Sequence, residues 1–281
     1  QDGVSSAAKT AFETGGTSPL DNTAALKADV VNMGKITATS VEVHGAHIRF
    51  LNAANVTTDG TALAPVTIYT ASVASTVDEV DRGYAHIGYT GATTPNNFTR
   101  GNTTSANPEY YKLVSNQTDL DNINTTNLAG NYMLENDIDL GGAAHTPIGG
   151  NAHGAFTGKF DGNFFRIENI NVSGVDNAGL FGVLDGASIY NVGVVGGSIA
   201  SNTGSGNKYA GGIAAASTDS ALYNVYVKDT KIDGKQYLHA GIVGHMSNST
   251  IDGAYSKAKV GTNGAGIVGR AEPGTVIKNT Y

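Results

Sequence analysis

Ala178-Gly179-Leu180-Phe181-Gly182 is a short apolar block framed by glycines, and copies of it recur through the rest of the chain. The later copies are AGGIA at residues 210–214, AGIVG at 240–244 and AGIVG at 265–269, at intervals of 32, 30 and 25 residues. Self-similarity at such periods is typical of solenoids, in which each repeat packs against its neighbours. The repeated structural positions are Gly179, Leu180, Phe181, Gly182, Ile213, Gly241, Ile242, Gly244, Gly266, Ile267 and Gly269.

Two further apolar segments follow each glycine block. One is expected as a strand at residues 189–194, 222–227, 251–255 and from 277 on, and the other at 197–200, 230–233 and 258–261. Alternation within each segment sends successive side chains to opposite faces. Three short strands per coil, with glycines at the corners, predict an all-β fold: a right-handed, single-stranded parallel β-helix (β-solenoid) with inserted loops.

The first part of the chain carries a looser repeat. VEVH at residues 41–44 aligns with VTIY at 66–69, and HIRF at 47–50 aligns with HIGY at 86–89. We expect short coils from about residue 30 and an inserted loop at 70–83. A polar stretch follows, and after it we expect a strand at 110–113 and a short helix in which Thr118 is the N-cap, with Asp121 three residues later.

The composition narrows the class of protein. The 281 residues carry a formal charge of −7, which argues against a nucleic-acid partner, since phosphate binding needs clustered cations. No apolar run is long enough for a membrane span. The chain has no cysteine, which favours a bacterial exported protein or a cytosolic one over a small secreted eukaryotic domain. Residues 277–281 repeat the start of an earlier strand, so we expect a piece of a longer protein.

Five motifs from Tyr111 onward occur in a distinctive order. They are GNYMLENDIDL at residues 130–140, TPIG at 146–149, FTGKFDGN at 156–163, IENI at 167–170 and GLFG at 179–182. This order resembles the GLUG-repeat region of large bacterial surface proteins, including adhesins and the non-catalytic part of some IgA proteases. The resemblance covers about residues 110–281 and implies a surface-exposed, non-catalytic module.

The stretch from residue 28 to residue 89 is similar to filamentous-haemagglutinin-like exoproteins. Those proteins are exported by two-partner secretion or as autotransporters, and their shafts are right-handed parallel β-helices. The asparagine-proline motifs of the family's secretion domain are missing here. We expect four parts: residues 1–29 as a partly irregular lead-in, 30–90 as haemagglutinin-like coils, 91–130 as a polar loop with a short helix, and 131–281 as a GLUG-repeat β-helix truncated at its C-terminus.

Three carboxylates are candidates for chemistry. Polysaccharide lyases and hydrolases on β-helices use carboxylates from one face of the coils, which singles out Asp137, Asp139 and Asp161. Asp137 and Asp139 flank Ile138, and Asp161-Gly162-Asn163 has the composition of a turn, so a structural role is the stronger interpretation. The same oxygen-rich corners are weak calcium candidates. We expect no cofactor.

Asparagines and tyrosines recur in the apolar segments. Asn169, Asn191, Asn224 and Asn279 are predicted to form an internal ladder that satisfies buried backbone groups through side-chain amides. The tyrosines are candidates for an exposed stripe that stacks on sugars, with aromatic packing along the coils as the alternative. Tyr223 and Tyr226 cannot share a face of a regular strand. The tyrosines concerned are Tyr190, Tyr223, Tyr226, Tyr237 and Tyr255.

These features predict a non-enzymatic protein that is secreted or lies on the bacterial cell surface. The first hypothesis is an extracellular β-helical stalk or adhesion segment that attaches to a protein or glycan receptor on host or neighbouring cells. The second is a structural module that self-associates into an extracellular filament through exposed coil edges. The third is a polysaccharide-active β-helix enzyme. A group of three converging carboxylates would favour the enzyme, and regular contacts between copies would favour the filament.

Overall fold

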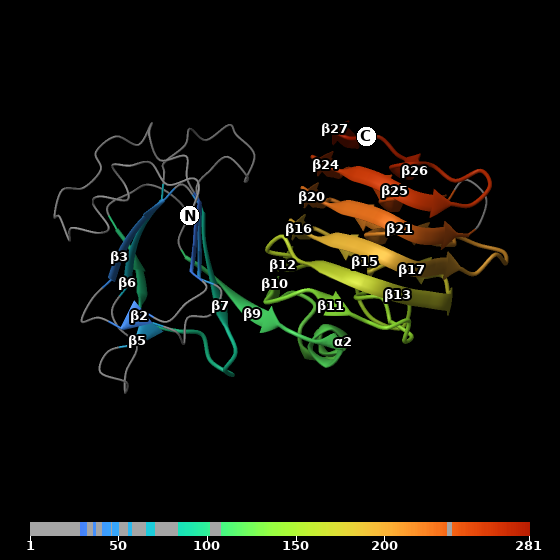
Figure 1. The fold of residues 1–281 in the computed structure, drawn as a ribbon. Helices are drawn as coiled ribbons and strands as arrows, with labels where there is room; N and C mark the ends of the chain where they lie inside the picture. The colour runs from blue at the N-terminus through green and yellow to red at the C-terminus, as the bar shows by residue number, and fades with distance from the viewer. Residues whose placement is uncertain are drawn as a thin grey trace. The chain divides into compact units, whose positions relative to one another are not determined.

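The computed structural model describes residues 29–32, 36–37, 41–45, 47–50, 56–57, 66–70, 84–101, 108–234 and 238–281. The chain forms two compact units, Gln1–Leu113 and Val114–Tyr281, and each is described by itself (Figure 1). Residues 1–28 of the lead-in expected at 1–29, and residues 71–83 of the loop expected at 70–83, lie outside the described residues.

The first unit consists of parallel strands. One set is β1 (Asp29–Asn32), β4 (His47–Phe50), β7 (Tyr84–Tyr89) and β9 (Glu109–Val114); another is β3 (Val41–Gly45), β6 (Val66–Thr70) and β8 (Phe98–Arg100); and β2 (Ile36–Thr37) pairs with β5 (Val56–Thr57). Alternate residues of these strands meet in one core, which includes Ile48, Phe50, Val66, Ile68, Ile87 and Phe98. The region expected as a polar loop at 91–130 therefore contains strands as well as a helix.

The second unit is a parallel β-helix, in which strands of successive coils lie one above another (Figure 1). The first stack is β10 (Asn131–Leu134), β12 (Lys159–Asp161), β16 (Ser188–Tyr190), β20 (Ala221–Tyr223), β24 (Thr250–Asp252) and β27 (Val276–Lys278). The second stack is β11 (Ile138–Asp139), β13 (Arg166–Val175), β17 (Gly193–Ser201), β21 (Tyr226–Asp233) and β25 (Tyr255–Val260).

The glycine blocks form the remaining side of the coil. They contribute β14 (Asn177–Ala178), β18 (Tyr209–Gly211) and β22 (His239–Ala240) to one short stack, and β15 (Phe181–Asp185), β19 (Ala214–Thr218), β23 (Val243–Ser247) and β26 (Val268–Ala271) to the next. A complete coil thus has four strands rather than the expected three, because each block bends the chain between two short strands. The predicted parallel β-helix is confirmed, and its right hand stays a prediction that rests on the handedness of parallel crossovers.

The repeated apolar positions meet in one core, as predicted. Leu180, Ile213 and Ile242 are fully buried, and Ile267 packs against the same cluster. Phe181 is also fully buried, with its ring centroid 5.3 Å from that of Phe156 and 5.4 Å from that of Phe160. Burial of apolar surface between coils is therefore the main source of stability in this unit.

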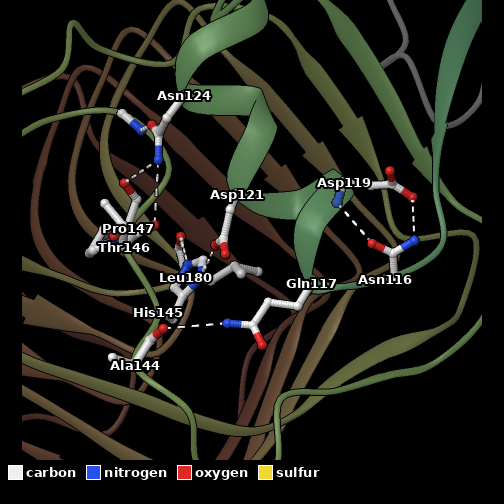
Figure 2. Close-up of polar contacts among 11 residues, drawn as sticks. Asn116, Gln117, Asp119, Asp121, Asn124, Ala144, His145, Thr146, Pro147 and Leu180 are labelled. Atoms are coloured by element: carbon white, nitrogen blue, oxygen red, sulfur yellow. Dashed lines mark hydrogen bonds and ion pairs between the residues drawn. The ribbon is translucent and has the colours of Figure 1, made fainter.

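The helix α2 (Gln117–Thr126) packs on the first coils of the second unit (Figure 2). Leu120 and Ile123 are fully buried in the core of that unit. Asn124 fastens the helix: its Nδ2 donates to the carbonyl of Pro147 at 3.2 Å, and its Oδ1 accepts from the N–H of Gly149 at 2.8 Å. The helix therefore shields apolar core that the first coil would otherwise expose.

The start of α2 differs from the expectation. The N-cap is Asn116, whose Oδ1 accepts from the N–H of Asp119 at 3.0 Å, while Asn116 Nδ2 donates back to Asp119 Oδ2 at 2.9 Å. The prediction of Thr118 with Asp121 was therefore wrong by two residues. Both pairs have the spacing of a capping box, and asparagine caps a helix at least as well as threonine.

We expect Asn124→Ala to lower the free energy of unfolding by about 1–3 kcal/mol, because the substitution leaves the N–H of Gly149 without its acceptor and the carbonyl of Pro147 without its donor. Urea denaturation monitored by circular dichroism measures the change. The control is Asn122→Ala, whose side chain is exposed on the same helix. Equal effects of the two substitutions would contradict the anchoring role of Asn124.

Candidate functional site

The outward side of β21 and β25 presents lysines and tyrosines to solvent. Val227 and Ile232 of β21 point into the core, which leaves the alternate residues facing outward. The lysines and tyrosines of this surface, which we call the lysine–tyrosine face, are Tyr226, Lys228, Lys231, Tyr255, Lys257 and Lys259, and Asp229 and Asp233 of β21 are exposed as well. A chain with a formal charge of −7 thus carries a local concentration of positive charge.

The lysines stand in two pairs across neighbouring coils. Lys228 is the Cα partner of Lys257, and Lys231 is the Cα partner of Lys259, with a register shift between the two pairs. Parallel neighbours of this kind lie about 4.8 Å apart, and like charges directly opposite one another are destabilising. Lys228 has an ion pair with Asp229 at 3.8 Å, whereas within the described residues none is recorded for Lys231, Lys257 or Lys259.

The tyrosines form a column beside the lysines. The rings of Tyr226 and Tyr255 lie 5.1 Å apart and 5° from parallel, and those of Tyr255 and Tyr281 lie 5.5 Å apart and 12° from parallel. Gly193 makes room for the column, since a Cβ there would lie 2.1 Å from the ring of Tyr226. Burial raises the pKa of Tyr226. Because the two rings stack on each other, the stacked faces of Tyr226 and Tyr255 are not accessible to a sugar.

The single tyrosine stripe considered from the sequence was wrong. Tyr190 and Tyr223 stack on each other at 5.7 Å in the first stack of strands, where they are 7% and 8% exposed. Tyr226 and Tyr255 belong to the second stack, so Tyr223 and Tyr226 are on different sides of the coil, as predicted. Tyr237 lies outside the described residues. The four described tyrosines of this set therefore pack on one another along the coils, which was the alternative to a sugar-binding stripe.

Asp137 and Asp139 are engaged at a turn. Asp137 accepts from the backbone N–H of Arg166 at 3.0 Å and lies 3.1 Å from its Nη2, and Glu168 binds the Nε of Arg166 at 2.6 Å. Asp139 Oδ1 accepts from Asn169 Nδ2 and from the N–H of Gly141, both at 2.8 Å. These hydrogen bonds hold the pKa of Asp139 below its ordinary value, Asn169 contributing most. Both carboxylates therefore serve the local turn and ion pair.

Asp161 is fully buried, and it closes a turn as the sequence indicated. Its Oδ1 accepts from the N–H of Asn163 at 2.8 Å and from Asn191 Nδ2 at 3.1 Å. Among the residues that the structure describes, no group of three or more histidine, aspartate or glutamate side chains is gathered to hold a metal ion. The arrangement that would have favoured calcium or carboxylate catalysis is thus not found in that part of the chain.

The asparagine ladder exists, with a different membership and location. Asn224 Nδ2 donates to Asn191 Oδ1 at 2.9 Å, and Asn279 Nδ2 donates to Asp252 Oδ1 at 2.6 Å. Asn224 and Asn279 are exposed, and their amides bond side chains of the preceding coil, so the expectation of an internal ladder serving buried backbone was wrong. Each of these asparagines has a φ near +52°, a conformation that asparagine tolerates better than most residues.

Asn169 does not belong to that ladder. It lies within β13, in the second stack, where its Nδ2 donates to Asp139 as described above. Its φ of +52° matches that of Asn191, so the two residues share a backbone conformation and a local sequence but not a column. A further column that the sequence analysis missed joins Asn248 Nδ2 to Asp219 Oδ1.

The lysine pairs were also missed, although the sequence carries a signal for them. YVKDTK at residues 226–231 and YSKAK at 255–259 align when the chain is folded at its repeat, and both then place lysines on the outward positions. No helix in the described part of the chain is both long and apolar enough to cross a bilayer. Comparison with protein-family models, with curated proteins and with solved structures gave no match to this chain.

Proposed function

We propose that this chain is an extracellular stalk and adhesion segment of a large bacterial surface protein of the filamentous-haemagglutinin-like type with GLUG repeats. The order of motifs from Tyr111 to Gly182 supports the family, and the parallel β-helix is the architecture that this resemblance implies. In such a helix, each interior strand is hydrogen-bonded to the coils on both sides, which suits a stiff spacer between a cell and its target.

The observation that carries the adhesive role is the lysine–tyrosine face. Its four lysines project from adjacent coils, in register, on a sheet whose other side is buried core. A surface on which aligned lysines outnumber the aspartates is suited to steer and hold a partner of negative charge. The three aspartates considered for catalysis are engaged in turns and an ion pair, which supports a binding module over an enzyme.

Adherence of the purified chain to cells tests this proposal. The fluorescently labelled chain is incubated with host epithelial cells and with bacterial cells, and bound fluorescence is measured against chain concentration. We expect saturable binding that excess unlabelled chain displaces. Binding no greater than that of an unrelated acidic protein of similar size would contradict adhesion. Sedimentation velocity of the chain alone distinguishes the alternative, since a filament module grows into polymers with rising concentration.

A further inference from the structure

The paired lysines have a geometry that selects a class of partner. Each in-register pair brings two ammonium groups to strand spacing, about 4.8 Å, so both groups can contact one anion placed between them. Along β25, Lys257 and Lys259 are two residues apart, which is about 6.6 Å of strand. The face therefore offers two anion positions, one per lysine pair, in a line along the strands.

The residue type indicates the anion. Lysine acts as a compact, strongly hydrated point charge and is a common ligand of phosphate, whereas arginine is favoured where a carboxylate or a phosphate is held by two parallel hydrogen bonds. Arg166 is the arginine nearest the tyrosine column in the described second stack, and Asp137 and Glu168 already hold its guanidinium. The cations of the lysine–tyrosine face are therefore lysines, and this face does not use arginine to bind an anion.

The rest of the face suits a polymer with short polar linkers. The phenol edges of Tyr226 and Tyr255 line the end of the lysine rows, while their ring faces are occupied by each other. Bases of single-stranded nucleic acid bind by stacking on exposed aromatic faces, whereas the faces that Tyr226 and Tyr255 turn to each other are covered and only Tyr281 at the end of this column is largely exposed. Hydroxyl groups of a polyol or sugar linker can instead exchange hydrogen bonds with phenol groups.

We propose that the lysine–tyrosine face binds a linear phosphodiester polymer with polyol linkers, the chemistry of cell-wall polymers, and that each in-register lysine pair holds one phosphate. This inference rests on the proposed adhesive function and names the class of its partner. The polymer runs along β21 and β25. Its charge relieves the repulsion within the pairs Lys228–Lys257 and Lys231–Lys259.

Binding of a poly(glycerol phosphate) oligomer to the whole chain tests the proposal by calorimetry at several salt concentrations. With two phosphates bound, one per lysine pair, and about 0.7 counterions released per phosphate, affinity should fall roughly 7-fold between about 50 and 200 mM salt. Removing one pair, in Lys228→Gln/Lys257→Gln or in Lys231→Gln/Lys259→Gln, should halve the logarithmic salt slope and weaken binding roughly tenfold at low salt.

The matched control is Lys208→Gln/Lys278→Gln, which removes the same charge from two lysines that pair with Asp176 and Asp252. This control should keep the slope of the unchanged chain. Thermal unfolding checks that all variants are folded. The proposal is overturned if the pair variants bind like the control, if the control loses as much as they do, or if heparin or phosphatidylglycerol vesicles bind more tightly than the oligomer.

Failure of this proposal is distinguishable from failure of the proposed function. If the unchanged chain adheres to cells while the lysine-pair variants adhere equally well, adhesion stands and another surface carries it. If the unchanged chain does not adhere to any cell but binds the oligomer, the adhesive function fails while the phosphodiester site stands.

Discussion

Phe181→Ala is expected to lower the free energy of unfolding of the second unit by about 3–5 kcal/mol, the largest effect that we predict for a single side chain. Phe181 is fully buried and packs against Phe156 of the preceding coil and against Phe160 of its own coil. Truncation to alanine removes the apolar contact and leaves a cavity that the stacked coils cannot easily close. A shift of the urea midpoint with an unchanged slope is the measurement.

Phe164→Ala is the control for Phe181→Ala. The side chain of Phe164 is 59% exposed, so its truncation should change the free energy of unfolding by no more than about 0.5 kcal/mol. If Phe164→Ala lowers the free energy of unfolding as much as Phe181→Ala, the placement of Phe164 on the surface and Phe181 in the core is contradicted.

Gly241→Ala is expected to destabilise the second unit by about 1–3 kcal/mol through overpacking. A Cβ at Gly241 would lie 2.1 Å from the carbonyl oxygen of Gly266, which is the equivalent glycine of the next coil, and 2.0 Å from Ser256 Oγ. The backbone of one coil cannot move away without breaking the hydrogen bond from the N–H of Gly241 to the carbonyl of Ala265. Thermal unfolding measures the change.

Gly266→Ala is the matched control at the same repeat position. No atom lies within 4 Å of the Cβ that alanine would add there, and φ of Gly266 is not in the left-handed region. Alanine should be neutral or stabilise the chain by up to about 1 kcal/mol, by restricting the unfolded state. The two substitutions should therefore have opposite signs or very different sizes. Equal losses would contradict the close approach of successive glycine blocks.

The sequence predicted the fold because the repeat and the alternation of apolar residues agree with each other. VEVH and VTIY were aligned correctly, since Val41 pairs with Val66 and His44 with Tyr69. The alignment of HIRF with HIGY was wrong by two residues, because His47 pairs with Tyr84 and Phe50 with Ile87. A slip of two residues leaves every side chain on its own face, so the hydrophobic pattern cannot detect it.

The candidate site was less predictable than the fold. Asn169 and Asn191 both follow an Ile-x pair and both have φ near +52°, yet they lie in different stacks, since any corner with a left-handed residue favours asparagine. The lysine pairs depend on the pairing of β21 with β25 and on the register shift between Lys228 and Lys231. The overall composition does not indicate the lysine pairs either, because the net charge of the chain is negative.

The stacking of coils in register is most directly tested by spin labels placed on neighbouring coils. The chain has no cysteine, so Lys231→Cys/Lys259→Cys carries two labels at exposed positions that are Cα partners on β21 and β25. Strands at about 4.8 Å spacing predict strong dipolar broadening of the electron paramagnetic resonance spectrum. A spectrum equal to the sum of the two singly labelled chains would contradict the parallel β-helix at the lysine–tyrosine face.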